Sequence, residues 1–176
     1  MIWPSVTQIL NPYVDFSNVP HDRLVLASER GTLVHEACAA LAQGVFPMDI
    51  QPEISGYVES FRRWFYPVVD DVLLIETRLA DEAMGYHGQP DILVRSKHGE
   101  ILLVDYKTPL ALSKSWRLQM AAYKRLCELA GFAPDRCGSL RLSPEGKTPA
   151  MQWYENSAQD ITLFLQALNL WRFFYA

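Results

Sequence analysis

Two apolar runs joined by a short turn constrain the fold of this chain more than any other feature of its sequence. The first run is DILVR, from Asp91 to Arg95, and the second is ILLVDYKT, from Ile101 to Thr108. Both are dense in β-branched and aliphatic residues, and residues 96–99 between them have the composition of a tight turn. We therefore expect two antiparallel neighbouring strands, whose pairing brings the carboxylates of Asp91 and Asp105 to the same end of a sheet.

The second run also carries charged residues at its end. Side chains alternate between the two faces of a strand, so Asp105 and Lys107 should project from one face while Tyr106 points away. An ammonium group at the end of an apolar strand must face either water or a site. Hard cations such as Mg²⁺ prefer oxygen ligands, so Asp91, Asp105 and the backbone carbonyl of Tyr106 are candidate metal ligands, with Lys107 beside them.

Length and composition predict one compact globular domain over residues 1–176. The hydrophobic fraction is 49% and the charged fraction 20%, which excludes disordered and fibrous classes. The three cysteines are widely separated and match no zinc-binding pattern, which indicates buried thiols in a reducing compartment. No apolar run approaches the roughly 18 residues of a membrane span, and no basic residue precedes an apolar run at the N-terminus. We expect a cytoplasmic protein with no membrane partner.

The other hydrophobic patterns predict an α/β fold, with a mixed sheet flanked by helices. A capping box at Ser5–Gln8 opens a short helix that Pro12 stops. Pro67 should end the third helix, and Ser157 should cap the last one. Further helices are expected over residues 21–41, 53–66, 113–130 and 157–171, and further strands over residues 72–80, 139–142 and 150–154, of which the first completes a three-stranded meander.

The charges are unevenly distributed along the chain. The formal net charge is -4, whereas general nucleic-acid binders usually carry a basic excess. Residues 107–147 nevertheless hold eight Lys or Arg residues against three acids, a local excess of five positive charges. This distribution fits a protein that engages phosphates at one place rather than one that coats a duplex. The alternative is that most of these residues are individually solvated surface charges.

Four short motifs follow one another in a fixed order. They are GTLVHEA with His35, GQPD with Asp91, DYKT with Asp105 and Lys107, and QMAAY with Gln119 and Tyr123. This series resembles the PD-(D/E)XK nuclease superfamily, most closely its RecB-like branch of DNA exonucleases. That branch shows a His in an early helix, a G-x-x-D strand, a D-x-K strand and a Q-x-x-x-Y helix. The resemblance covers roughly residues 30–125 and implies a restriction-endonuclease-like core.

The resemblance also implies roles for individual residues. His35 corresponds to the helical metal ligand of the branch, which gives a site of His35, Asp91 and Asp105 for Mg²⁺, with Mn²⁺ as a substitute. Lys107 could orient or deprotonate the attacking water, or stabilise the pentavalent transition state. Glu76 matches an acidic residue on the preceding strand that could hold a second metal, a ligand water or a neighbouring side chain. The alternative for Glu76 is an ordinary charge at a strand end.

A substrate-binding group is implied on the helix over residues 113–130. Gln119 and Tyr123 lie four residues apart on one helix face, where the family pair contacts DNA phosphate or braces the catalytic lysine. Trp116 and Arg117 could stack on and pair with a nucleic-acid strand, although a Trp at such a position is more often part of the core. Gly31 and Gly88 are expected to allow close backbone approach near the metal.

The departures from the family limit the expected function. Some RecB-like nucleases hold an iron-sulfur cluster with four cysteines, and this chain has only three, so we expect no cluster. No nucleotide-binding G-x-x-x-x-G-K-[ST] motif occurs, so the protein should act on free ends, gaps or single strands. We expect a Mg²⁺-dependent deoxyribonuclease, most simply an exonuclease in recombination, repair or phage DNA processing, with a homo-oligomer or a repair protein as further partner.

Three other functions stay open at this point. They are a structure-specific endonuclease on the same fold, a noncatalytic DNA-binding or assembly module, and an RNA-directed hydrolase. The aromatic C-terminal run LWRFFYA could dock on the core or form a partner interface.

Overall fold

The computed structural model describes residues 3–15, 17, 19–45, 49–109, 112–155 and 158–175. Its helices are α1 (Val6–Leu10), the 3-10 helix η1 (Asn11–Tyr13), α2 (His21–Ala42), α3 (Pro52–Val68), α4 (Ser115–Leu129) and α5 (Ala158–Tyr175). Its strands are β1 (Val69–Ile75), β2 (Leu79–Asp81), β3 (Tyr86–Gly88), β4 (Ile92–Ser96), β5 (Ile101–Lys107), β6 (Arg136–Arg141) and β7 (Ala150–Tyr154).

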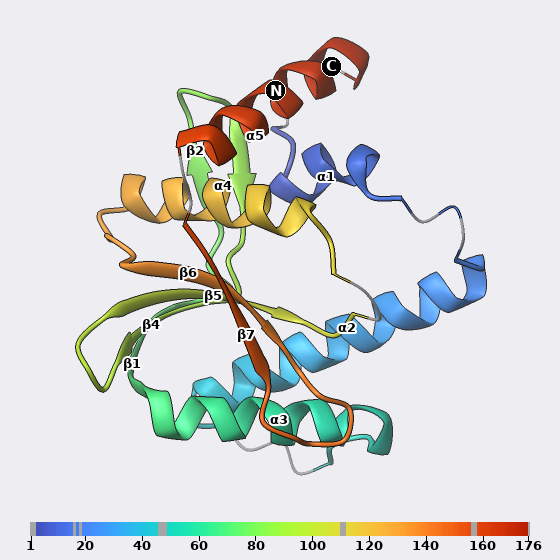
Figure 1. The fold of residues 1–176 in the computed structure, drawn as a ribbon, viewed down its shortest axis with the longest axis vertical. Helices are drawn as coiled ribbons and strands as arrows, with labels where there is room; N and C mark the ends of the chain where they lie inside the picture. Colours follow the sequence, from blue (N-terminus) through green and yellow to red (C-terminus); the bar gives the residue numbers. More distant parts are fainter. Residues whose placement is uncertain are drawn as a thin grey trace.

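Five strands form one mixed sheet in the order β1-β4-β5-β6-β7. Strands β5 and β6 are parallel and are joined through α4, and the other neighbouring pairs are antiparallel. Helices α2 and α3 cover one face of the sheet, and α1, α4 and α5 lie on the other side (Figure 1). The expected α/β fold with a mixed sheet flanked by helices is therefore confirmed.

The sheet is buried on both faces, which explains the nearly continuous apolar runs in its central strands. Ile92 and Val104 pack with α2 and α3 in one core, whereas Leu93 and Leu103 pack with α4 and α5 in the other. Side chains continue to point alternately to the two faces of the sheet up to the end of β5. Tyr106 belongs to the α2 and α3 side, whereas the neighbouring charged residues face α4.

The sequence predicted most helices correctly. Ser5 Oγ accepts a hydrogen bond from the Gln8 backbone N–H, and the Gln8 side chain accepts one from the Ser5 N–H, so the capping box is confirmed. Helix α3 runs through Pro67 to Val68, so the expected stop at Pro67 was wrong, because a proline so close to a helix end removes only one donor. The expected cap Ser157 lies outside the described residues.

The strand predicted over residues 72–80 was wrong, because the chain breaks at Glu76 into β1 and β2. Glu76 has a φ of 44°, in the left-handed region that extended strands do not use. The chain then leaves the large sheet, and β2 pairs with β3 in a separate two-stranded hairpin. The three-stranded meander is nevertheless present, since β1, β4 and β5 are antiparallel neighbours with this hairpin inserted between the first two.

Three further expectations concern whole-chain features. Cys38, Cys127 and Cys137 are buried and form no disulfide with one another, as predicted. Among the described helices, none is both long and apolar enough to cross a bilayer. The C-terminal aromatic run continues helix α5, and the side chains of Phe173 and Phe174 are exposed there. A partner interface at this end of α5 therefore stays a prediction.

Candidate functional site

The two expected carboxylates lie at the same end of the sheet. Asp91 immediately precedes β4, and the pairing of Ile92 with Val104 sets Asp91 close to Asp105 on the neighbouring strand. Asp91 is 5% exposed and Asp105 is 2% exposed. The Tyr106 backbone N–H donates to Asp91 Oδ2 at 2.5 Å, which fixes the Asp91 carboxylate against β5. Antiparallel pairing therefore brings these residues together as the sequence predicted.

Helix α2, which covers one face of the sheet, places His35 beside these carboxylates. Its Nδ1 lies 3.2 Å from Asp91 Oδ1 and 4.0 Å from Glu76 Oε1. The imidazole ring also packs edge-on against the Tyr106 ring, with 5.6 Å between the centroids. His35 is thus held between a carboxylate cluster and a buried aromatic ring. Its role as a metal ligand, which the resemblance implied, stays a prediction.

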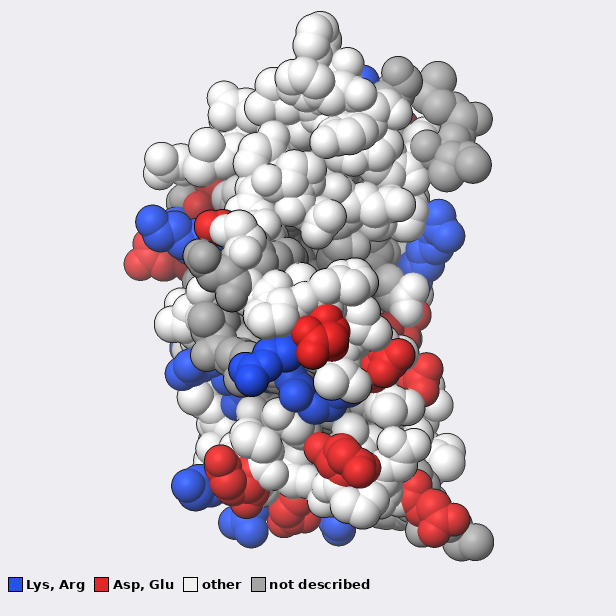
Figure 2. All heavy atoms as spheres, turned by 90° about the vertical axis from the view of Figure 1, so that its right-hand side faces the viewer, with Lys and Arg blue, Asp and Glu red and all other residues white. Residues whose placement is uncertain are grey.

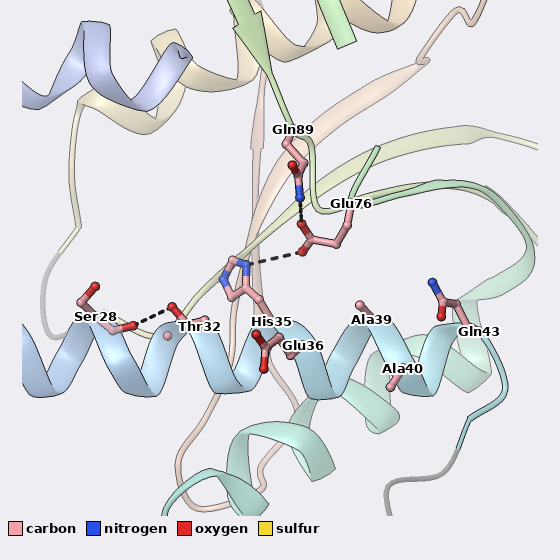
Figure 3. A pocket seen from close by; sticks show the side chains of 10 residues that line it. Ser28, Thr32, His35, Glu36, Ala39, Ala40, Gln43, Glu76 and Gln89 are labelled. Atoms are coloured by element: carbon pink, nitrogen blue, oxygen red, sulfur yellow. Dashed lines mark hydrogen bonds and ion pairs between the residues drawn. The ribbon is translucent and has the colours of Figure 1, made fainter. Parts of the chain in front are cut away.

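The carboxylate of Glu76 is aimed at His35 by both backbone and side-chain contacts. Its left-handed backbone costs on the order of 1 kcal/mol for a residue with a side chain, and such strain clusters at functional sites. The Glu76 N–H donates to the Asp91 carbonyl at 3.0 Å, and Glu76 Oε2 accepts from Gln89 Nε2 at 2.7 Å. Figure 3 shows Glu76 and Gln89 extending toward His35 above helix α2. Glu76 is therefore part of the site.

One nitrogen and two carboxylate oxygens form a candidate metal-binding group. Ligand atoms of His35, Glu76 and Asp91 all lie within 4.8 Å of one another. A ligand set of carboxylate oxygens with one imidazole can bind Mg²⁺. It suits Mn²⁺ better than Mg²⁺, because Mn²⁺ accepts a nitrogen ligand more readily. The sequence expected Asp105 in this trio and left Glu76 open. Asp105 is instead engaged by Lys107, whose Nζ lies 2.5 Å from Asp105 Oδ2.

The contact through Tyr106 differs in kind from the expected one. Tyr106 supplies its backbone N–H to Asp91, and its predicted carbonyl contact to a metal stays a prediction. Asp105 Oδ2 is buried, and the Lys107 ammonium is its partner at 2.5 Å.

Lys107 is held by a hydrogen-bonded network on helix α4. Lys107 Nζ donates to Gln119 Oε1 at 2.9 Å, and Gln119 Nε2 donates to Asp105 Oδ1 at 3.3 Å and to the Tyr123 hydroxyl at 3.2 Å. Gln119 and Tyr123 are buried. A Cβ on Gly88 would lie 2.7 Å from Tyr123 Cε1, so this close approach of β3 to α4 requires glycine. Of the two roles that the resemblance implied for Gln119, the geometry supports bracing Lys107.

The crowded carboxylates perturb one another and His35. Burial raises the pKa of Asp105, the Asp91 carboxylate adds to the rise, and Lys107 opposes it. Burial and Asp91 likewise raise the pKa of Glu76, with the Gln89 hydrogen bond acting against them. Burial disfavours a charged His35, yet the Asp91 carboxylate, helped by Asp105 and Glu76, raises the pKa of His35 to about 9. Once a metal displaces the His35 proton, three carboxylates lie against the Lys107 ammonium, and this excess of negative charge favours a bound cation.

These residues share one cavity of about 450 Å³. Asp105, Lys107, Gln119 and Tyr123 line it together with the three residues of the metal-binding group. A larger cavity of about 650 Å³ runs along α2 and is lined by His35, Glu36, Glu76 and Gln89 (Figure 3). His35 lines both cavities, so the metal-binding group lies where two cavities meet.

Two of the predicted substrate-binding residues make structural contacts, although the Arg117 side chain stays 54% exposed. Trp116 is 8% exposed, and its ring lies 5.4 Å from Lys107 Nζ, so it packs behind the lysine as part of the core. Arg117 Nη2 donates to both oxygens of Asp160, at 2.9 and 3.2 Å, and links α4 to α5. Close approach at Gly31 was also wrong, because the nearest atom to an added Cβ is 3.9 Å away.

The sequence missed two residues that shape the site. Gln89 orients Glu76, and the only sign of it was its place inside the GQPD motif. Arg30 Nη2 donates to the Thr108 carbonyl at 3.2 Å, and its guanidinium lies 5.5 Å from the Tyr57 ring centroid. Arg30 thereby fixes the end of β5 against α2, and no motif indicated it.

The basic segment over residues 107–147 is largely used in structural contacts. Arg125 pairs with the buried Asp81 at 2.7 Å, Lys124 lies 3.8 Å from Glu128, and Arg136 stacks over Trp153. Figure 2 shows basic side chains gathered near the middle of one face, with acidic side chains beside and below them. Five basic residues of the segment are nevertheless exposed: Lys114, Arg117, Arg136, Arg141 and Lys147.

Comparison with known proteins adds no relationship. No protein-family model matches this sequence, and no curated protein matches it. The case for a function therefore depends on the order of the motifs and on the geometry of the cavity that they line.

Proposed function

We propose that this protein is a Mg²⁺-dependent deoxyribonuclease of the PD-(D/E)XK superfamily, on a restriction-endonuclease-like core and closest to the RecB-like branch. The observation that supports the proposal most strongly is that residues from distant parts of the sequence line the same cavity. His35 lies on α2, Asp91 just before β4, Lys107 on β5 and Gln119 on α4, and all four line one cavity of about 450 Å³. The motif order supports the family, and the shared cavity supports a common chemical task.

The metal-binding group fits a divalent cation by charge and by ligand type. His35, Glu76 and Asp91 would hold Mg²⁺ or Mn²⁺, with the buried Asp105 carboxylate beside them. When bound, such an ion would lower the pKa of a ligand water and offset charge on the phosphoryl oxygens. The ion would also neutralise the excess of carboxylates in the cavity.

Lys107 is the proposed catalytic cation of the chain itself. Its ammonium is fixed between Asp105, Gln119 and the Trp116 ring, so it needs little reorganisation during reaction. From this position it orients the attacking water and stabilises the negative charge that develops on the phosphoryl oxygens. Gln119 and Tyr123 are positioning residues, because they reach the substrate only through Lys107 and Asp105.

The same geometry argues against a noncatalytic module. Such a module needs no partly buried ammonium next to two buried carboxylates, because burying charges costs free energy unless a function or a partner offsets it. This chain retains Asp91, Asp105 and Lys107. An exonuclease is the simplest form of the activity, because the chain lacks a helicase motif and would depend on ends or single strands.

The test is cleavage of end-labelled DNA in the presence of Mg²⁺, Mn²⁺ or a chelator. We expect products only with metal, and faster cleavage of linear than of circular single strands if the protein is an exonuclease. Lys107→Met should lower the rate by about a thousandfold, the cost of losing a transition-state contact. Lys147→Met, at an exposed position, is the matched control.

Two results would contradict the proposal. One is cleavage that persists in chelator, and the other is a Lys107→Met variant with wild-type turnover. Matched RNA and DNA oligonucleotides decide whether the substrate is DNA. Asp91→Asn should weaken Mn²⁺ binding, whereas Asp71→Asn, on the exposed side of β1, should leave it unchanged.

A further inference from the structure

A separate cavity of about 470 Å³ adjoins the candidate site. It is bounded by α1, the first half of α2, the end of β5 and the start of α4. His35, Lys107 and Gln119 line this cavity and also the metal-lined one. A phosphate held beside Lys107 would therefore have its neighbouring nucleotide within reach of this space. The volume lies in the range of small-molecule sites, roughly 300–1,000 Å³.

The lining of this second cavity differs from that of the metal-lined one. Among the described residues that line it, Lys107 is the single Lys, Arg, Asp or Glu. Hydroxyl and amide groups of Asn11, Ser28 and Thr108 are spaced among its walls. The walls themselves are mainly apolar and aromatic: Leu10, Val14, Leu24, Ala27, Tyr106, Pro109 and Trp116.

Such a lining fits a nucleobase better than a phosphate. A phosphate would lose its hydration against apolar walls without enough charged groups to compensate. A base has two apolar faces and a polar edge, so apolar walls could cover the faces while hydroxyl and amide groups bind the edge. Trp116 would then contribute to a wall of the subsite and not a free stacking surface.

We propose that this cavity is a nucleobase subsite, which receives one unpaired base from the nucleotide next to the scissile phosphate. The inference rests on the proposed nuclease function and names its substrate class. A base in a duplex is stacked and paired, so entry requires a single strand or an opened end. The protein therefore cleaves single-stranded DNA in preference to intact duplex.

The first test uses the wild-type protein with a series of single-stranded oligonucleotides. Each oligonucleotide has one cleavable phosphodiester bond, phosphorothioates elsewhere, and a single abasic residue at a different distance from that bond. We expect kcat/KM to fall about tenfold when the abasic residue adjoins the cleaved bond on one side, the usual effect of a lost base contact. Rates that are equal for every position would overturn the subsite.

The second test fills the cavity from helix α2. Ala27→Phe adds a ring to its wall, whereas Leu26→Phe changes the adjacent side chain, which is 62% exposed, and is the matched control. Ala27→Phe should lower kcat/KM on intact single strands about tenfold and should cleave intact and abasic oligonucleotides at equal rates. Mn²⁺ affinity should stay at the wild-type value in both variants.

The two proposals fail in different ways. A wild-type protein that cleaves DNA with metal, but shows no dependence on the abasic position, overturns the subsite alone. A wild-type protein that cleaves no DNA under any metal condition overturns the nuclease and the subsite together. Loss of folding in Ala27→Phe would leave the abasic series with wild-type protein as the deciding measurement.

Discussion

Glu76 adopts a backbone conformation that few residues with side chains use, and Gln89 holds its carboxylate in place. The hydrogen bond to Glu76 Oε2 leaves Oε1 as the oxygen closest to His35. Partners that orient metal ligands commonly change metal affinity by an order of magnitude or more, although they never touch the ion. Gln89 is such a partner if the metal-binding group holds a cation.

Gln89→Leu tests this role. The substitution keeps the approximate size of the side chain and removes the donor, so Mn²⁺ should bind roughly 10- to 100-fold more weakly. Isothermal titration would measure the affinity. Gln43→Leu is the control, because Gln43 lines the same larger cavity from the residue that follows helix α2. Equal Mn²⁺ affinity in wild-type protein and Gln89→Leu would remove Gln89 from the site.

Proton competition at His35 gives a second prediction at this scale. The Asp91 carboxylate and its neighbours raise the pKa of His35 to about 9 against the effect of burial, so Nδ1 carries a proton at neutral pH. A cation needs the unprotonated nitrogen. Mn²⁺ affinity should therefore rise with pH, by up to about tenfold per unit, from about pH 7 to about pH 8.5.

The rise of Mn²⁺ affinity with pH should depend on His35. In His35→Gln the slope should become shallower, because no imidazole proton is displaced. Titrations of both proteins at several pH values measure it. A wild-type slope near zero, or the same slope in both proteins, would exclude His35 as the ligand that releases the proton.

At the scale of single elements, the sequence was informative where burial was complete. Strands β4 and β5 are covered on both faces, so their apolar runs were visible, and the period of two correctly assigned Asp105 and Tyr106 to opposite faces. The hairpin β2–β3 was missed for a local reason. Its strands have three residues each, and the break at Glu76 depends on contacts with Gln89 and Asp91 from later in the chain.

The packing of hairpin β2–β3 against α4 gives a prediction for Gly88. A Cβ at this position would meet Tyr123 Cε1 at 2.7 Å and Leu126 Cδ1 at 2.9 Å, so Gly88→Ala must push α4 away. We expect a loss of about 1–3 kcal/mol in the free energy of unfolding. Nuclease activity should fall as well, because Tyr123 and Gln119 move with the helix.

Gly31→Ala is the matched change on helix α2. The nearest atom to its added Cβ is 3.9 Å away, and alanine is the better helix former, so stability should rise by about 0.5–1 kcal/mol. Urea unfolding of both variants compares the two effects. A Gly88→Ala protein as stable as wild type would mean that α4 is not packed against β3 as described.

In the whole molecule, helices from both sides of the sheet contribute residues to the site, which lies at one end of the central strands β4 and β5. The order of the four motifs was enough to predict that His35, Asp91, Lys107 and Gln119 lie close together, because each motif lies in a segment that reaches this end of the sheet. Motif order could not predict that Glu76 joins His35 and Asp91 while Asp105 turns to Lys107. That choice is made by side-chain packing and by competition among charges, which a linear pattern does not contain.

The overall charge gives a prediction for substrate binding. The chain carries a net charge of -4, and Arg78 and Lys107 are the basic residues among the described lining of the metal-lined cavity. With about two cations on the phosphates of a single strand, the logarithm of affinity should fall with the logarithm of salt concentration with a slope of about -1.4. Binding of labelled DNA to Asp105→Asn measures it, and a slope steeper than about -4 would indicate an extended basic surface instead.

The most direct test of the account is the position of Mn²⁺ in crystals of the protein, located by anomalous diffraction. We expect one strong peak bonded to His35 Nδ1 and to carboxylate oxygens of Glu76 and Asp91, with Asp105 and Lys107 beside it. The same soak of Asp91→Asn should show a weaker peak or none. A Mn²⁺ ion bound elsewhere, with this cavity filled by water alone, would contradict the central claim.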